Sequence, residues 1–161
     1  MKTLIFLIVC FLSTIPVFAQ KKLTEVDLRV NGIHSGSQFS AVLRKFGRPS
    51  SVKHLGFDEC GRGLRKVLHY PGLAIGLLGD GKGRKYQVIS IGLTSSKWTV
   101  SPGIRIGAGK DLVQSRYGQP NEGSYPGQDV LDYVTKENLG GVTFYFKNGR
   151  LIRVLMMETL C

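Results

Sequence analysis

The sequence contains the same pattern of glycine, isoleucine and proline twice, 71 residues apart. Gly32-Ile33-x-x-Gly36 precedes an apolar-periodic segment that ends at Gly47-x-Pro49, and Gly103-Ile104-x-x-Gly107 precedes a second one that ends at Gly118-x-Pro120. The spacing within the two copies is identical. Duplication at a fixed period indicates two supersecondary units that bury a shared surface. We therefore expect a first repeat over residues 20–97 and a second over residues 98–161, packed as one compact unit.

The first 19 residues have the composition of a secretory signal peptide. Lys2 gives the N-terminal region of the signal peptide its positive charge, and residues 4–17 are mostly apolar. Val17-Phe18-Ala19 forms the cleavage site. The apolar run is shorter than the ~20 residues that a membrane-spanning helix needs, and Ser13 and Pro16 interrupt it. We expect a mature chain that begins at Gln20, is secreted or periplasmic, and has no transmembrane segment.

Cys60 and Cys161 are the two cysteines that follow the predicted cleavage site. An even pair in an oxidising compartment is most simply a disulfide, which here would connect a loop of the first repeat to the last residue of the second. Two free thiols or an intermolecular bridge are the alternatives, because spacing in the sequence does not establish that two sulfurs are close in space.

Each repeat is expected to begin with one short helix. Phe39, Val42, Leu43 and Phe46 recur at helical spacing, and Gly47 is a natural helix end that Pro49 reinforces. The second helix is predicted over residues 110–117, again followed by a glycine and a proline.

Residues 56–63 are predicted to form a glycine-rich loop that carries Cys60, and the period then changes to two. The predicted strands are residues 66–70, 73–78, 86–94, 130–135, 142–147 and 151–157, with Asn148-Gly149 as a hairpin turn. Because no crossover helices separate these strands, we expect antiparallel pairing. The predicted fold class is α+β, with two tandem repeats, each a short helix packed on a three- to four-stranded antiparallel meander, and with the two sheets side by side.

The repeated motif resembles the β-lactamase-inhibitory-protein fold, whose single-unit relatives are the SmpA/OmlA (BamE-type) envelope domains. The similarity lies in G-I-x-x-G, a helix, an aromatic-Gly-x-Pro turn, and a tyrosine before an apolar hairpin, Tyr70 and Tyr133 here. It covers nearly the whole mature chain. It implies a non-enzymatic protein-binding function without a cofactor, as an inhibitor or an envelope-assembly factor. This chain departs from both groups, since the inhibitors carry a disulfide within each copy and the lipoproteins carry an anchoring cysteine.

The basic charge is concentrated in the first repeat. Residues 20–97 hold 14 Lys and Arg against five Asp and Glu, whereas residues 98–161 hold seven against six. Such a field speeds encounters with anionic partners, although surface charge that serves only solubility is the alternative. The residues expected to bind an acidic protein or an anionic envelope component are Arg62, Arg65, Lys82, Arg84 and Lys85, together with the aromatic residues Trp98, Tyr125 and Tyr133.

Patterns for catalysis, metal binding or nucleic-acid binding are missing from the sequence. None of its three histidines has a partner at metal-ligand spacing, and Gly83 stands where a phosphate-binding loop has Ser or Thr. No nucleic-acid module is recognisable. We therefore expect a secreted or periplasmic, non-enzymatic module for an acidic protein partner. The alternatives are a basic binder of polyanions or of the envelope surface and, more weakly, a small hydrolase that uses His69.

Overall fold

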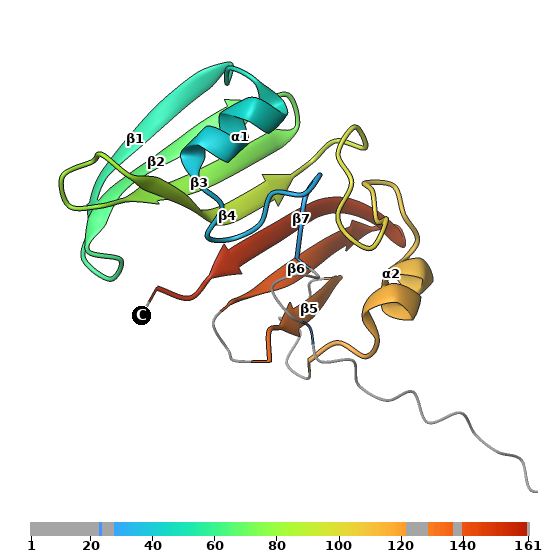
Figure 1. The fold of residues 1–161 in the computed structure, drawn as a ribbon. Coiled ribbons are helices and arrows are strands. Elements are labelled where there is room, and N and C mark those ends of the chain that lie inside the picture. The colour runs from blue at the N-terminus through green and yellow to red at the C-terminus, as the bar shows by residue number, and fades with distance from the viewer. Residues whose placement is uncertain (1–22, 24–27, 122–128, 137–139, 161) are drawn as a thin grey trace, which may run out of the picture.

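The structure is a computed structural model, and it describes residues 23, 28–121, 129–136 and 140–160. The predicted signal peptide, residues 1–19, lies outside the described residues. The described residues form two short helices and seven strands, whose arrangement is drawn in Figure 1. In chain order they are α1 (Phe39–Phe46), β1 (Ser51–Asp58), β2 (Gly63–Tyr70), β3 (Leu73–Gly79), β4 (Tyr86–Leu93), α2 (Lys110–Tyr117), β5 (Val130–Val134), β6 (Gly140–Lys147) and β7 (Arg150–Glu158).

All seven strands belong to one antiparallel sheet, in the spatial order β1-β2-β3-β4-β7-β6-β5. Residues 90–93 of β4 pair with residues 154–157 of β7 and join the two halves of the chain. The predicted fold class, α+β with two tandem helix-plus-meander repeats and two separate sheets, is therefore wrong. The physical reason is that β4 and β7 would each leave a row of unpaired backbone groups at a sheet edge, and pairing them satisfies both rows.

The duplicated sequence motif nevertheless has repeated local geometry within this single sheet. Gly47 and Gly118 each come directly after a helix. Their φ angles are positive, 77° and 84°, and residues other than glycine rarely adopt such values. The Tyr70 hydroxyl donates to the Gly47 carbonyl at 3.0 Å, and the Tyr133 hydroxyl donates to the Gly118 carbonyl at 3.0 Å. The same contact thus ties the end of α1 to β2 and the end of α2 to β5.

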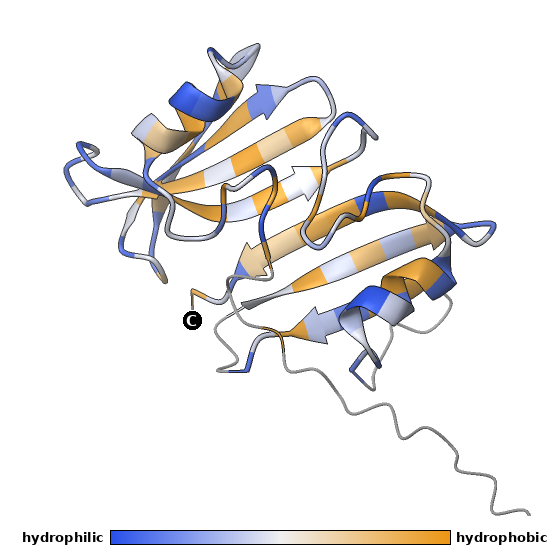
Figure 2. Ribbon diagram, turned by 45° about the vertical axis from the view of Figure 1, so that its right-hand side comes forward, coloured by the Kyte–Doolittle hydropathy of each residue, from blue (hydrophilic) through white to orange (hydrophobic). Residues whose placement is uncertain are grey.

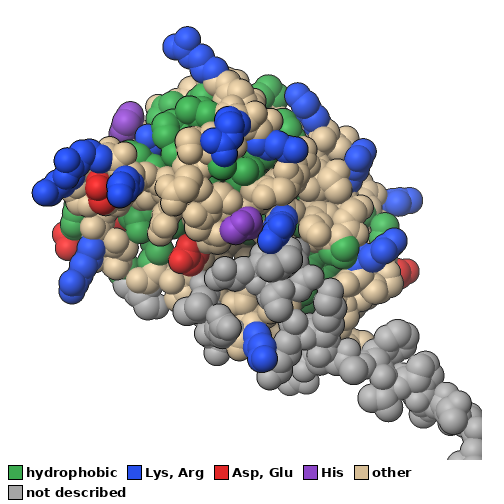
Figure 3. All heavy atoms as spheres, viewed as in Figure 1, with side chains coloured by type: hydrophobic (Ala, Val, Ile, Leu, Met, Phe, Trp, Pro, Cys, Tyr) green, Lys and Arg blue, Asp and Glu red, His purple; other side chains and the backbone are tan. Residues whose placement is uncertain are grey.

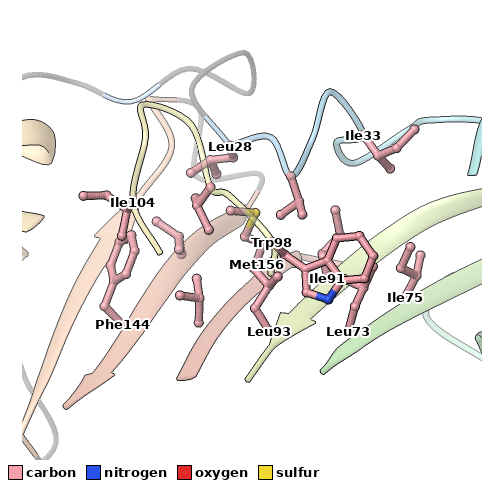
Figure 4. Close-up of a cluster of buried hydrophobic side chains, with 14 of the residues drawn as sticks. Leu28, Ile33, Leu73, Ile75, Ile91, Leu93, Trp98, Ile104, Phe144 and Met156 are labelled. Atoms are coloured by element: carbon pink, nitrogen blue, oxygen red, sulfur yellow. The ribbon is translucent and has the colours of Figure 1, made fainter. Parts of the chain in front are cut away.

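The hydrophobic core lies between one face of the sheet and the two helices with their connecting segments (Figure 1). Along the strands, apolar and polar residues alternate, as Figure 2 shows. In Figure 4, Ile91 and Leu93 of β4 lie with Met156 of β7 beneath Leu28 and Trp98, which come from outside the sheet. The junction of β4 and β7 is thus covered by apolar side chains from both halves of the chain.

β1 is the strand that the sequence prediction missed. Residues 56–63 were expected to form a loop, but residues 51–58 form a strand that pairs with β2, and the turn spans only the four residues between them. A β-bulge between His54 and Gly56 shifts the register and breaks the two-residue alternation that identifies a strand. β1 is exposed along nearly its whole length, so it also lacks the apolar signal of a core strand.

Tyr133 couples stability to alkaline pH, because burial raises its pKa to about 12. The folded state holds this proton more tightly than the unfolded chain does, whose tyrosine pKa is about 10. The resulting stability is fully present below pH 10 and is lost as the pH rises toward 12. We expect the free energy of unfolding, measured by urea titration, to fall across this window more steeply in the wild type than in Tyr133→Phe. Equal slopes in the two proteins would contradict this assignment.

Candidate protein-binding surface

The second face of the sheet carries the strand residues that alternate with the core residues. We call it the open face, because neither described helix packs on it. The register of the strands places these side chains on it: Arg65, Val67, His69, Ala74, Ser90, Thr143, Tyr145, Leu155 and Met157.

A hollow of about 650 Å³ lies on the open face over β4, β5, β6 and β7. Leu155 and Met157 of β7 and Tyr145 of β6 line it, and Met157 is 54% exposed. Cys60, from the turn after β1, and residues 159–160 at the end of β7 border the same hollow. The surface is therefore concave and combines apolar, aromatic and polar side chains.

Polar side chains around the hollow are held by contacts with one another. The Arg65 guanidinium lies 2.9 Å from the Asp58 carboxylate, and Thr143 donates to Asp132 at 2.7 Å. The Gly61 backbone N–H and then Arg65 lower the pKa of Asp58, so this carboxylate stays ionised. Arg65 is thus engaged in an ion pair within the surface.

Four cationic residues gather at one end of the sheet. Arg62 lies in the turn between β1 and β2, whereas Lys82, Arg84 and Lys85 lie in the turn between β3 and β4. Because β2 and β3 are antiparallel, these two turns are neighbours, and Arg62 and Lys85 line one pocket of about 310 Å³. We call Arg62, Lys82, Arg84 and Lys85 the basic tip; Figure 3 shows Lys and Arg side chains clustered around this end of the molecule.

Asp80, which lies beside the basic tip, is hydrogen-bonded within its own turn. The Asp80 carboxylate accepts a hydrogen bond from the Arg84 backbone N–H at 2.7 Å, and this contact is the main reason that its pKa is lowered. Asp80 therefore shapes the β3–β4 turn and offsets only part of the charge of the tip.

Two of the three predicted aromatic binding residues, Trp98 and Tyr133, are buried. Trp98 is 8% exposed, its Nε1 donates to the Pro71 carbonyl at 3.0 Å, and its ring packs against Phe46 at 5.3 Å. Tyr133 is 2% exposed in the core, and Tyr125 lies outside the described residues. Sequence reasoning did not single out Tyr145, Leu155 or Met157; the signal for them was their alternation with buried neighbours in β6 and β7.

The predicted Cys60–Cys161 disulfide cannot be placed from the described residues, since Cys161 lies outside them. Leu160, which precedes it, lines the same hollow as Cys60. The described chain up to Leu160 thus borders the hollow that Cys60 also borders, and the disulfide stays a prediction.

The histidines are dispersed within the part of the chain that the structure describes. His34 Nδ1 lies 2.6 Å from the Ser35 carbonyl oxygen, whereas His69 shares a shallow hollow of about 360 Å³ with Ala74 and Arg153. Among the described residues, no group of three or more His, Cys, Asp or Glu side chains could hold a metal ion. Neither described helix is long and apolar enough to cross a membrane.

No family model matches the chain, and no curated protein matches it. A DUF4309 family protein, YjgB, from Bacillus subtilis is similar in structure with 18% sequence identity and a TM-score of 0.42, over 76% of this chain and 79% of that one. A cysteine-rich secretory protein, SAV1118, from Staphylococcus aureus has 14% identity and a TM-score of 0.46, over 78% of this chain and 44% of that one. Similarity at this level carries no conclusion about function, and the resemblance to the β-lactamase-inhibitory-protein fold stays a prediction.

Proposed function

We propose that the protein is a secreted or periplasmic, non-enzymatic module that binds an acidic protein partner through the open face and the basic tip. The observation that carries this proposal is the hollow of about 650 Å³ on the open face. It is a concave surface of mixed chemistry on a rigid sheet, with a cluster of cations at one end of that sheet.

The side chains of the hollow are of the kinds that protein interfaces favour. Tyr145 offers a large, rigid ring, and the Arg153 guanidinium stacks on it with 5.1 Å between its carbon and the ring centroid. Met157 is exposed and flexible, so it can adapt to the shape of a partner. Burying Met157 and Leu155 under a partner would remove apolar surface from water and supply the non-directional part of the affinity.

The basic tip supplies steering toward an acidic partner. Charged residues at the rim of an interface act mainly on the association rate and on partner choice, whereas buried contacts set the lifetime of the complex. We therefore assign the lifetime of the complex to the hollow and its association rate to Lys82, Arg84 and Lys85.

The proposal is tested by capture with the mature chain as bait, from the envelope fraction or the culture fluid of the cells that make it. Any captured acidic protein is then titrated against wild type, Met157→Lys and the control Leu112→Lys, which places the same cation at an exposed position on α2. Met157→Lys should weaken binding about tenfold or more because it puts a charge into the buried part of the interface, and Leu112→Lys should not. An unchanged affinity in Met157→Lys, or equal losses in both variants, would remove the hollow from the interface.

The basic tip also favours a second candidate function, the binding of a polyanion or an anionic envelope surface. The pocket between Arg62 and Lys85 places two cations within reach of one anionic group. Binding of this kind falls steeply as ionic strength rises, because the charges are exposed and screened. Replacing Lys82, Arg84 and Lys85 with alanine should abolish binding to anionic vesicles, but should only slow association with an acidic protein. A persistent interaction with the vesicles in this triple variant would contradict the second candidate.

A further inference from the structure

The outer edge of β1 is a long strand edge that no described strand covers. β1 pairs with β2 on one side only, and it is the first strand in the order of the sheet. Three of its apolar side chains are exposed: Val52 and Leu55 at 44% each and Phe57 at 52%. An exposed strand edge with apolar side chains is a template for pairing with another strand.

We propose that β1 pairs with β1 of a second copy of this chain, antiparallel and across a two-fold axis. The two seven-stranded sheets then form one continuous sheet through the dimer. Such an interface is isologous, so each contact between two different positions occurs twice.

The β-bulge in β1 selects the register of this pairing. Residues 51, 53, 56 and 58 pair with residues of β2 on the open face, whereas residues 52, 54 and 57 pair with residues on the face toward the helices. An antiparallel pair requires that the residues opposite each other lie on the same face. With the two-fold axis between residues 54 and 55, residues 51–53 of one copy lie opposite residues 58–56 of the other, each on the same face, and the two bulges lie opposite each other. Two-fold registers centred elsewhere on β1 leave each bulge without a counterpart and pair fewer residues.

The side chains are self-complementary in this register. Val52 lies opposite Phe57 of the second copy, and the pair occurs twice, so four exposed apolar side chains cover one another. Lys53 lies opposite Gly56 of the second copy, which avoids direct opposition of like charges. Arg48 precedes the strand and Glu59 follows it, so the two-fold axis brings opposite charges to each end of the interface.

The charge of the first half of the chain works against this dimer. Residues 20–97 carry 14 basic and five acidic side chains, and two such halves repel each other. Added salt should therefore tighten the dimer, whereas it should loosen a complex with an acidic partner. The hollow is bordered by Asp58 at the end of β1 but not by Val52 or Phe57. The variants that test the dimer therefore leave the lining of the hollow unchanged, and this inference and the proposed function can each fail alone.

The test is analytical ultracentrifugation of the mature wild-type chain from low to high micromolar concentration, at low and at moderate salt. We expect a reversible monomer–dimer equilibrium that shifts toward the dimer as salt is added. Phe57→Lys and Val52→Lys should each raise the dissociation constant about tenfold or more, because each variant removes both apolar pairs and adds two cations. The control Leu112→Lys should match the wild type.

Hydrogen exchange of the β1 amides separates this interface from other dimers. Their protection should rise with concentration in the wild type but not in Phe57→Lys. Thermal unfolding of each variant at low concentration establishes that it is folded, and the two substitutions are tested independently so that one unfolded variant does not decide the result. A chain that is monomeric throughout, or a dimer that both variants leave intact, would overturn the proposal.

Discussion

Replacing Phe144 with alanine should lower the free energy of unfolding by about 3–5 kcal/mol, which is the range for removing a fully buried aromatic side chain from a core. Phe144 is 0% exposed at the centre of β6. Its ring centroid lies 4.8 Å from that of Tyr117 in α2 and 5.9 Å from that of Tyr133 in β5. The variant would lose both ring contacts and leave a cavity between helix and sheet, because the surrounding backbone can collapse only in part.

The control for this prediction is Leu112→Ala on α2. Leu112 is 44% exposed, so its truncation should change stability by no more than about 0.5 kcal/mol. Urea denaturation of both variants and of the wild type measures the difference. A loss below about 1 kcal/mol in Phe144→Ala would mean that the Tyr117–Tyr133–Phe144 cluster is not packed as described.

Removing the predicted disulfide should have an effect of similar size. A bridge between Cys60 and Cys161 closes a loop of about 100 residues, for which the chain-entropy estimate is ~4–5 kcal/mol at most. We expect the double variant Cys60→Ser/Cys161→Ser to lose a large part of this stability relative to the oxidised wild type. Denaturant titration with and without a reducing agent measures this loss of stability. The mass of the oxidised mature chain should be lower than that of the reduced chain by two hydrogens.

The double variant also supplies the control, because its stability should not respond to the reducing agent. Equal stability of the oxidised wild type and the double variant would show that the bridge contributes nothing. A tryptic peptide linking Cys60 to a second copy of Cys60 would identify the intermolecular bridge that the sequence left open as an alternative.

Local elements of this fold could be predicted from the sequence. The first helix is confirmed with its predicted end at Phe46, and so is the second helix over residues 110–117. Both have glycine and proline stop signals directly after the last helical residue, and these signals act within a few residues of chain. The six predicted strands, which do not include β1, are confirmed within a few residues of their predicted ends, because two-residue alternation is also a local property.

The arrangement of these elements could not be predicted in the same way. The pairing of Ser90 with Met157 joins residues from opposite halves of the chain, and nothing in either strand alone specifies its neighbour. The duplication favoured two sheets, since each copy contains its own hairpins. A continuous sheet differs from that prediction through one pairing, which buries two edges at once.

The surroundings of individual side chains also depend on contacts that are distant in the sequence. Lys66 was counted with the surface charge of the first repeat, but its Nζ lies 4.2 Å from the ring centroid of Phe39 and 3.5 Å from that of Tyr86. Burial lowers its pKa, and the two rings hold this cation on the face toward the helices and not on the open face. Trp98 was expected to be at a binding surface, and its place beneath α1 depends on Phe46, which is 52 residues earlier in the chain. Such long-range contacts leave no local trace in the sequence.

The strand order has a consequence for how the chain is made. β7 follows β6 in the chain, but it lies between β4 and β6 in the sheet. Until β7 has emerged from the ribosome, the outer edge of β4 has no strand to pair with. The nascent chain therefore has an unpaired strand edge during this time. The sheet is therefore completed only after residues 150–158 have left the ribosome, and a nascent chain that stops short of Arg150 would expose the unpaired edge of β4 to other chains.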